Sequence, residues 1–80
     1  MSEYTRMRWL CRRGMKELDE LLTRFVERDF EHAPAPVQAA FAALLEYSDP
    51  ELYALLCGRA APCDPEQADV IVRIRHAADA

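Results

Sequence analysis

The chain has 80 residues, of which 51% are hydrophobic and 30% charged, and its formal net charge is −4. A chain of this size and balance folds around one small core, which excludes a disordered tail and leaves little room for a deep pocket. No run of about 20 apolar residues is present, so a membrane-spanning helix is excluded. We therefore expect one domain that covers residues 1–80.

Charge is distributed unevenly along the chain. The first sixteen residues carry five basic side chains against one acidic, a net charge of +4, whereas the other sixty-four carry five basic and thirteen acidic, a net charge of −8. A basic end can bind nucleic acid, an anionic membrane or an acidic protein surface, but the acidic remainder repels the first two. The pattern favours an acidic protein partner, with no nucleic acid and no membrane insertion.

Two helices are predicted in the first half of the chain. The first covers about residues 3–13 and ends at Gly14, with Trp9 off its apolar stripe. That stripe comprises Tyr4, Met7, Leu10 and Cys11. The second helix has the clearest amphipathic pattern, with apolar residues at helical spacing from Leu18 to Phe30. The glycine between them indicates that the first helix ends there, because a glycine inside a helix is about 1 kcal/mol less favourable than an alanine.

Three further helices are predicted after residues 32–37. The third covers Val37 to Leu45 and ends at Ser48. The fourth begins with Asp49 as N-cap and Pro50 at the first helical position, and ends at Gly58.

The fifth helix begins with Asp64 and Pro65, where Gln67 can close a capping box. Its β-branched residues near 71–75 are also compatible with a strand, but a lone strand has no partner. We therefore predict an all-α, single-domain bundle of about five short helices.

Neither metal binding nor catalysis is indicated by the polar residues. The chain has three cysteines, an odd number, and none is spaced as Cys-x-x-Cys; they are Cys11, Cys57 and Cys63. The two histidines, His32 and His76, are far apart in the sequence. We interpret the cysteines as reduced, small apolar residues of a protein in a reducing compartment. A nucleophile needs a base within hydrogen-bond reach, and no spacing here imposes one. The chain is expected not to be an enzyme.

Arg13 and Glu17 flank the glycine and have two interpretations. They can be a solvent-facing pair across a helix start, which contributes at most about 0.5 kcal/mol, or they can form a partner-binding patch. In either case both side chains are expected to be exposed, so replacing either one should leave stability within about 0.5 kcal/mol of wild type. Trp9 also has two interpretations: it can be an aromatic anchor for a partner, or it can be a core residue on a second face of its helix.

Two blocks of the sequence carry a resemblance to a known family. They are 8-RWLCRRGMKELDELL-22, with an Arg-Gly-x-x-Glu core at Arg13, Gly14 and Glu17, and 44-LLEYSDPELYALLCG-58. Both resemble blocks of the succinate dehydrogenase FAD assembly factor family, at matching separation and in chains of similar length. Two departures are a short C-terminus and the lack of the N-terminal targeting extension of mitochondrial members, which favours a bacterial cytoplasmic protein.

The resemblance implies a non-enzymatic chaperone. Members of that family bind the flavoprotein subunit of succinate dehydrogenase, or of a related fumarate reductase, and promote covalent attachment of FAD to it. With no nucleotide motif in the sequence, we expect no cofactor to be bound tightly by the isolated protein, which we expect to be monomeric alone. The expected partner-binding residues are Arg8, Trp9, Arg12, Arg13, Gly14, Lys16, Glu17, Asp49 and Pro50.

Two other classes of function stay open from the sequence. A small helical nucleic-acid-binding module, or a general protein-interaction module, could use the basic N-terminal helix, and nucleic-acid binding would then weaken steeply with salt. An enzyme would show a turnover that is lost when Cys11 is changed.

Overall fold

The apolar spacing of the sequence produces five α-helices and one short 3₁₀ helix in the computed structural model, which describes residues 3–79 and the side chains of residues 5–78. They are α1 (Glu3–Leu10), α2 (Lys16–Arg28), η1 (Phe30–His32), α3 (Ala35–Leu44), α4 (Asp49–Cys57) and α5 (Pro65–Asp79). No strand occurs within these residues, so the all-α prediction is confirmed, and residues 71–75 are helical. No helix of this part of the chain is long and apolar enough to cross a membrane.

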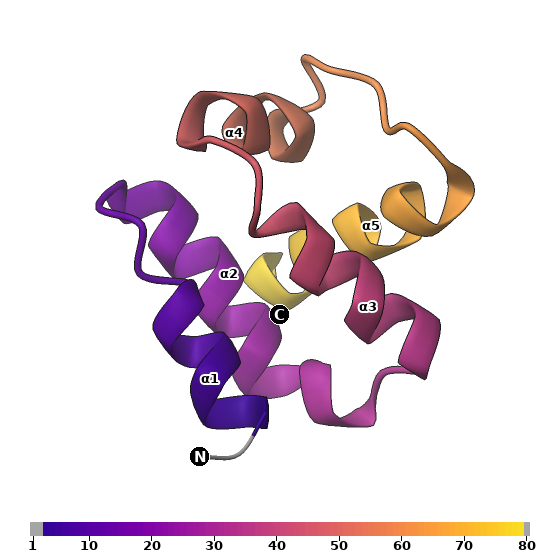
Figure 1. The fold of residues 1–80 in the computed structure, drawn as a ribbon. Helices are drawn as coiled ribbons and strands as arrows, with labels where there is room; N and C mark the ends of the chain where they lie inside the picture. Colours follow the sequence, from indigo (N-terminus) through magenta and orange to yellow (C-terminus); the bar gives the residue numbers. More distant parts are fainter. Residues whose placement is uncertain (1–2, 80) are drawn as a thin grey trace.

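The core lies where α5 packs against α2 and α3. Figure 1 shows α1 and α2 side by side, α3 across from them, and α4 above the junction of α1 with α2. Three aromatic rings from α2, η1 and α3 meet in the core, with centroids of Phe25 and Phe41 4.7 Å apart and Phe30 next to both. α5 adds Val70, Ile71 and Ile74, all buried. The C-terminal helix thus holds the two halves of the chain together.

The first helix is shorter than predicted. It ends at Leu10 instead of at residue 13, and the Leu10 side chain, expected in the core, is 43% exposed. Met7 and Cys11 are fully buried as predicted, whereas the side chain of Tyr4 lies outside those that the structure describes. The helix stops early because Arg13, three residues beyond it, is held by tertiary contacts that a continuing helix would break.

The start of α4 also differs from the prediction. Ser48, not Asp49, is the N-cap, since its hydroxyl accepts the N–H of Glu51 and also donates to the carboxylate of that residue at 2.7 Å. Asp49 is therefore the first residue of the helix, which leaves its carboxylate free for another element. At the other end Gly58 has φ +81 and closes a Schellman motif, in which the N–H of Arg59 reaches the carbonyl of Ala54 at 2.8 Å.

Asp64 caps α5 as predicted. Its carboxylate accepts the backbone N–H of Gln67 at 2.7 Å. The Gln67 side chain accepts the N–H of Cys63 at 2.8 Å and donates to the Tyr47 hydroxyl at 3.1 Å. The box therefore closes one residue earlier than predicted, and the buried Gln67 links α5 to the turn between α3 and α4.

Candidate functional site: a corner between the first two helices

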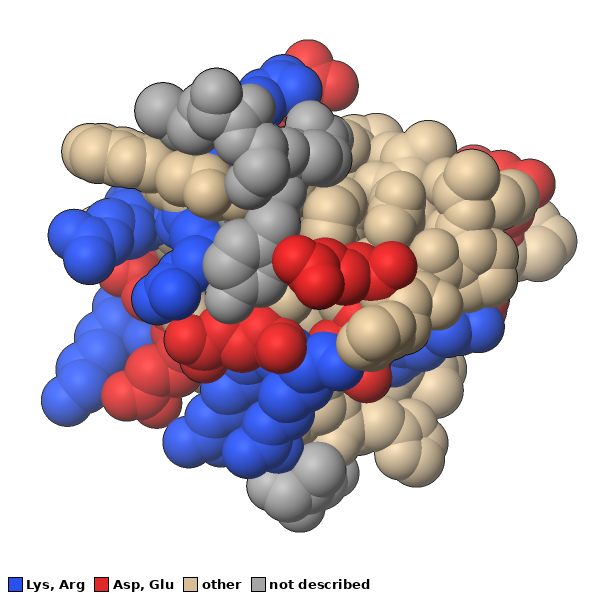
Figure 2. Space-filling view, turned by 90° about the horizontal axis from the view of Figure 1, so that it is seen from below, with Lys and Arg blue, Asp and Glu red and all other residues tan. Residues whose placement is uncertain are grey.

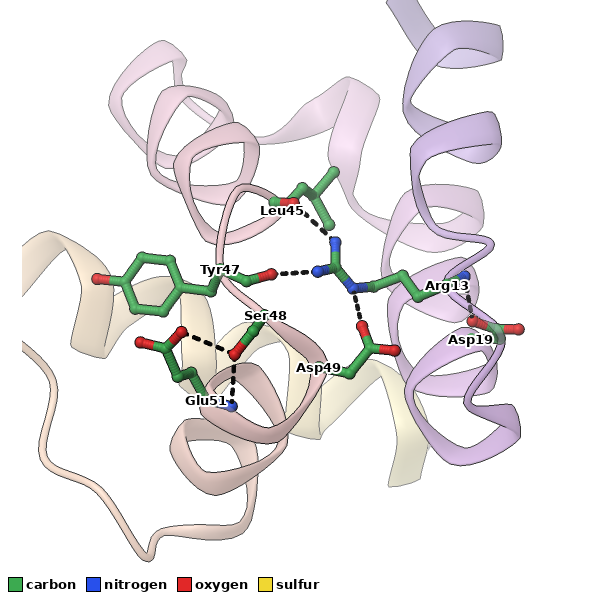
Figure 3. A network of polar contacts seen from close by, with 7 residues as sticks. All are labelled: Arg13, Asp19, Leu45, Tyr47, Ser48, Asp49 and Glu51. Carbon is green, nitrogen blue, oxygen red and sulfur yellow. Dashed lines mark hydrogen bonds and ion pairs between the residues drawn. The ribbon is translucent and has the colours of Figure 1, made fainter.

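Arg13 is the centre of a polar network at the corner between α1 and α2. Figure 3 shows its guanidinium pointing from the α1–α2 connection into the turn between α3 and α4. Nε donates to the Asp49 carboxylate at 2.6 Å, Nη1 to the carbonyl of Leu45 at 2.7 Å, and Nη2 to the carbonyl of Tyr47. The backbone N–H of Arg13 donates to the carboxylate of Asp19 at 2.7 Å. The network therefore joins three helices and the turn at one residue.

The expectation that Arg13 faces solvent is wrong. Its side chain is only 14% exposed, because the α3–α4 turn presents two carbonyls at the end of a helix and a carboxylate at the start of the next. These are acceptors that suit a planar guanidinium with donors in a fixed fork. With each of its three nitrogens engaged inside the protein, Arg13 holds the α1–α2 corner on the end of α3 and the start of α4.

Gly14 allows the chain to turn at this corner. Its φ is +88, a conformation that side chains with a Cβ rarely adopt, and a Cβ placed there would have no heavy atom within 4 Å. The cost of substitution is therefore backbone strain, of about 1 to 2 kcal/mol, and not a clash. The open space beside Gly14 also leaves the corner accessible to another molecule.

Lys16 and Glu17 are both exposed in the first turn of α2. A cation at the first position of a helix is opposed by the helix dipole, so fold stability does not explain Lys16. Side-chain hydrogen bonding with Glu17, followed by that with Cys57, raises the pKa of Tyr53 on α4 to about 12. Arg13 and Glu17 therefore do not project together: one is internal and the other lies at the surface.

Trp9 lies on the surface of α1, 67% exposed, so it is not a core residue. It borders a hollow of about 430 Å³ with Arg8, Arg12, Thr5 and Thr23. An exposed indole beside two guanidinium groups is the combination that interface anchors favour, because arginine and tryptophan gain the most from being covered. The sequence predicted Trp9, Arg8 and Arg12 together, and the structure brings them together.

Acidic side chains are interleaved with the basic ones on this side of the molecule. In Figure 2 the Lys and Arg side chains gather on the side of α1 and α2, with Asp and Glu among them, whereas the side of α3 is largely uncharged. One such pair is Arg8 with Glu27, whose side chains approach to 3.4 Å and are each almost half exposed. Such mixed charge suits a protein surface better than the uniformly negative backbone of a nucleic acid.

Asp49 and Pro50 are neighbours at the start of α4 but face different parts of the molecule. Asp49 faces Arg13, as described above, whereas the exposed Pro50 lines a hollow of about 440 Å³ on the other side of α4, with Tyr47 and Gln67. Pro50 is therefore not part of the surface that carries Trp9, and neither is Asp49, whose carboxylate is occupied by Arg13.

Several residues of the site were missed from the sequence. Asp19 and the carbonyls of Leu45 and Tyr47 hold Arg13, and Glu17 is the main cause of the raised pKa of Tyr53. A signal for Tyr53 was present, since it follows Asp49 at the i,i+4 spacing that places two side chains on one helix face. No sequence pattern indicates a backbone carbonyl as the partner of an arginine.

The cysteines occupy two kinds of environment. Cys11 is fully buried in the core, and burial, with the nearby Asp19 carboxylate, raises its thiol pKa to about 12, which makes a reactive thiolate inaccessible. Cys57 and Cys63 are exposed. Among the described residues there is no group of three or more histidine, cysteine and acidic side chains placed to hold a metal ion.

These features define a small helical protein whose most distinctive surface is a corner of exposed tryptophan, arginine and glutamate. Comparison with known proteins identifies the family: residues 5–78 match the family model described as flavinator of succinate dehydrogenase. The chain therefore belongs to this family.

Curated bacterial relatives cover nearly the whole chain. It is 42% identical over 75 residues to the FAD assembly factor SdhE of Shewanella oneidensis, covering 94% of this chain and 92% of the relative. It is 39% identical over 75 residues to the FAD assembly factor SdhE of Methylococcus capsulatus, covering 94% and 90% of the two chains. The corresponding protein of Coxiella burnetii is 41% identical over 71 residues, covering 89% and 87%. No solved structure matches significantly.

Proposed function

We propose that this protein is a non-enzymatic assembly chaperone of the bacterial cytoplasm. It binds the flavoprotein subunit of succinate dehydrogenase, or of a related fumarate reductase, and promotes covalent attachment of FAD to that subunit. The observation that carries the proposal is the family match over residues 5–78, supported by curated FAD assembly factors of similar length. The family was also indicated by the Arg-Gly-x-x-Glu block at residues 13–17.

The surface around Trp9 supports a role in binding. Its indole and the guanidinium groups of Arg8 and Arg12 form an exposed, positively charged patch beside a hollow, which fits a partner surface with acidic side chains and a protruding apolar group. The rigid network of Arg13 fixes the orientation of this corner. A pre-organised corner loses little conformational entropy on binding, so more of the contact energy is available for affinity.

Flavin attachment is chemistry that a flavin and its host subunit supply. A chaperone needs only to bind the attachment-competent conformation of that subunit more tightly than the other conformations, which raises the population of the competent form. The mature form then releases the chaperone, which acts again as a monomer. In this proposal the isolated protein does not bind FAD tightly, because its hollows are open and shallow for burying a dinucleotide.

The test is to mix the apo-flavoprotein, FAD and a dicarboxylate with and without this protein. Covalent flavin is then measured over time by in-gel fluorescence after denaturation. Faster attachment in the presence of the protein supports the proposal, and equal rates with and without it contradict the proposal. Calorimetric titration of FAD into the protein alone separates the mechanisms, since tight binding would indicate cofactor delivery instead.

A further inference from the structure

Two arginines border the hollow beside Trp9, and they differ in what they contact. The guanidinium of Arg8 forms an ion pair with Glu27 on α2, in which Nη2 lies 3.4 Å from Oε2. The guanidinium of Arg12 is exposed and makes no ion pair or hydrogen bond with any of the described residues. Contacts within the protein therefore engage one of the two arginines and leave the other available.

The ion pair of Arg8 with Glu27 contributes little to the fold. Both side chains are almost half exposed, and water screens the attraction between charges at such a site. α1 is held in place by apolar contacts instead, since Met7 and the nearby Cys11 are fully buried in the core. An exposed pair of this kind can be exchanged for another ion pair at low cost.

The charge and lining of the hollow suit a carboxylate on a short apolar stem. The described residues that line it include no acidic side chain, so a carboxylate there meets two guanidinium groups, those of Arg8 and Arg12. A guanidinium can donate two parallel N–H bonds to one carboxylate. The exposed indole of Trp9 provides an apolar wall beside them, against which methylene groups can pack. An aspartate or glutamate side chain of a partner protein therefore fits the hollow.

We propose that this hollow binds an acidic side chain of the flavoprotein and that Glu27 competes with that side chain for Arg8. In the free protein Arg8 pairs with Glu27, and in the complex it pairs with the flavoprotein carboxylate beside Arg12. Glu27 then lies unpaired near a second negative charge, which opposes binding. Glu27 thus limits affinity and helps the chaperone to leave and act again. The inference rests on the proposed function, since it names the flavoprotein group that meets this surface.

Calorimetric titration of Glu27→Gln with the apo-flavoprotein tests the competition. This variant should bind about two- to fivefold more tightly than wild type, the size expected for one exposed ion pair, with an unchanged melting temperature. A residue that supports the fold or contacts the partner favourably would give the opposite sign, so weaker or equal binding would overturn the inference.

Glu66→Gln is the matched control. It changes the net charge by the same amount, and Glu66 is exposed in the first turn of α5, on the opposite side of Figure 1 from α1. Its affinity for the flavoprotein should equal that of wild type at physiological ionic strength. An equal gain in Glu27→Gln and Glu66→Gln would show an effect of net charge alone, and would also overturn the inference.

Carbodiimide crosslinking of Arg8→Lys tests the exchange of partners directly. A carbodiimide joins a lysine amine to a carboxylate in contact with it, and Lys16 is the only lysine of the natural chain, so mass spectrometry can assign each crosslink. In the free variant the introduced amine should be joined to Glu27, and in the complex to an acidic residue of the flavoprotein. Arg12→Lys should be joined to the same flavoprotein residue. A crosslink to Glu27 that is undiminished in the complex would overturn the competition.

Failure of this inference and failure of the proposed function give different results. If wild type binds the flavoprotein and accelerates attachment while Glu27→Gln binds no more tightly, only this inference fails. If wild type neither binds nor accelerates, the proposed function fails and the inference with it.

Discussion

Replacing Arg13 by alanine should destabilise the fold, although sequence alone suggested a neutral surface change. The substitution removes the ion pair with Asp49 and the bonds to the carbonyls of Leu45 and Tyr47. It leaves the Asp49 carboxylate and the end of α3 without their charged donor. The α1–α2 corner then loses its attachment to the rest of the molecule.

The magnitude follows from the burial of the network. Hydrogen bonds to a charged group contribute about 1.5 to 3 kcal/mol each, but water can replace part of this loss where the acceptors are accessible. The Arg13 side chain is 14% exposed and that of Asp49 33% exposed, so replacement by water is partial. We expect a loss of about 2 to 3 kcal/mol, from a total stability of about 4 to 12 kcal/mol for a domain of this length.

The assay is thermal and urea unfolding followed by circular dichroism at 222 nm. A loss of this size should lower the melting temperature by roughly 8 to 24 °C, since each kcal/mol shifts a small domain by about 4 to 8 °C. Arg12→Ala is the matched control, because Arg12 is the neighbouring arginine and is exposed. Its stability should stay within about 0.5 kcal/mol of wild type. If Arg13→Ala melts at the same temperature as Arg12→Ala, the network does not stabilise the fold and the reasoning is refuted.

Four further outcomes follow from the geometry. Ser48→Ala should cost about 1 kcal/mol in urea unfolding, because the N-cap of α4 is lost, and an unchanged midpoint would contradict that role. Gly14→Ala should cost about 1 to 2 kcal/mol through its positive φ, with D-alanine introduced by chemical synthesis restoring stability. Iodoacetamide at pH 8 should alkylate Cys57 and Cys63 and spare Cys11 in the folded protein, as read by mass spectrometry. Folding raises the Cys11 pKa from 9 to about 12, so the stability that comes from keeping this thiol protonated is fully present below pH 9 and is lost as the pH rises towards 12. The free energy of unfolding should therefore fall over this pH range, and it should fall less in Cys11→Ala.

The helices could be predicted from the sequence because their signals are local. Apolar spacing from Leu18 onwards defined α2, and the Asp64–Pro65 start defined α5, where an acidic cap and a proline act within one turn. The end of α1 could not be predicted, since it depends on contacts between Arg13 and residues more than 30 positions away. Tertiary contacts here override the local preference for helix up to the glycine.

The site was only partly predictable, for a related reason. Trp9 is off the apolar stripe of its helix, which left open whether it is an anchor or a core residue, and the structure shows it exposed beside two arginines. The pattern around Arg13, a charged residue next to a glycine break, led to the expectation of an exposed side chain, but such a pattern does not by itself exclude an internal one. Only the position of the α3–α4 turn decides between them. The effect of Glu17 on the pKa of Tyr53 was missed for the same reason, because Tyr53 lies on another helix.

The most direct test of the account compares three proteins in the flavin attachment assay: wild type, the surface variant Trp9→Ala with Glu17→Gln, and the control Arg59→Ala. All three substituted side chains are exposed, and circular dichroism should show equal folding. Arg59 lies beyond the end of α4, outside the corner of exposed tryptophan, arginine and glutamate. The account predicts that wild type and Arg59→Ala accelerate covalent attachment of FAD equally, even at a tenth of an equivalent, and that the surface variant does so poorly. A surface variant as active as wild type would contradict the account.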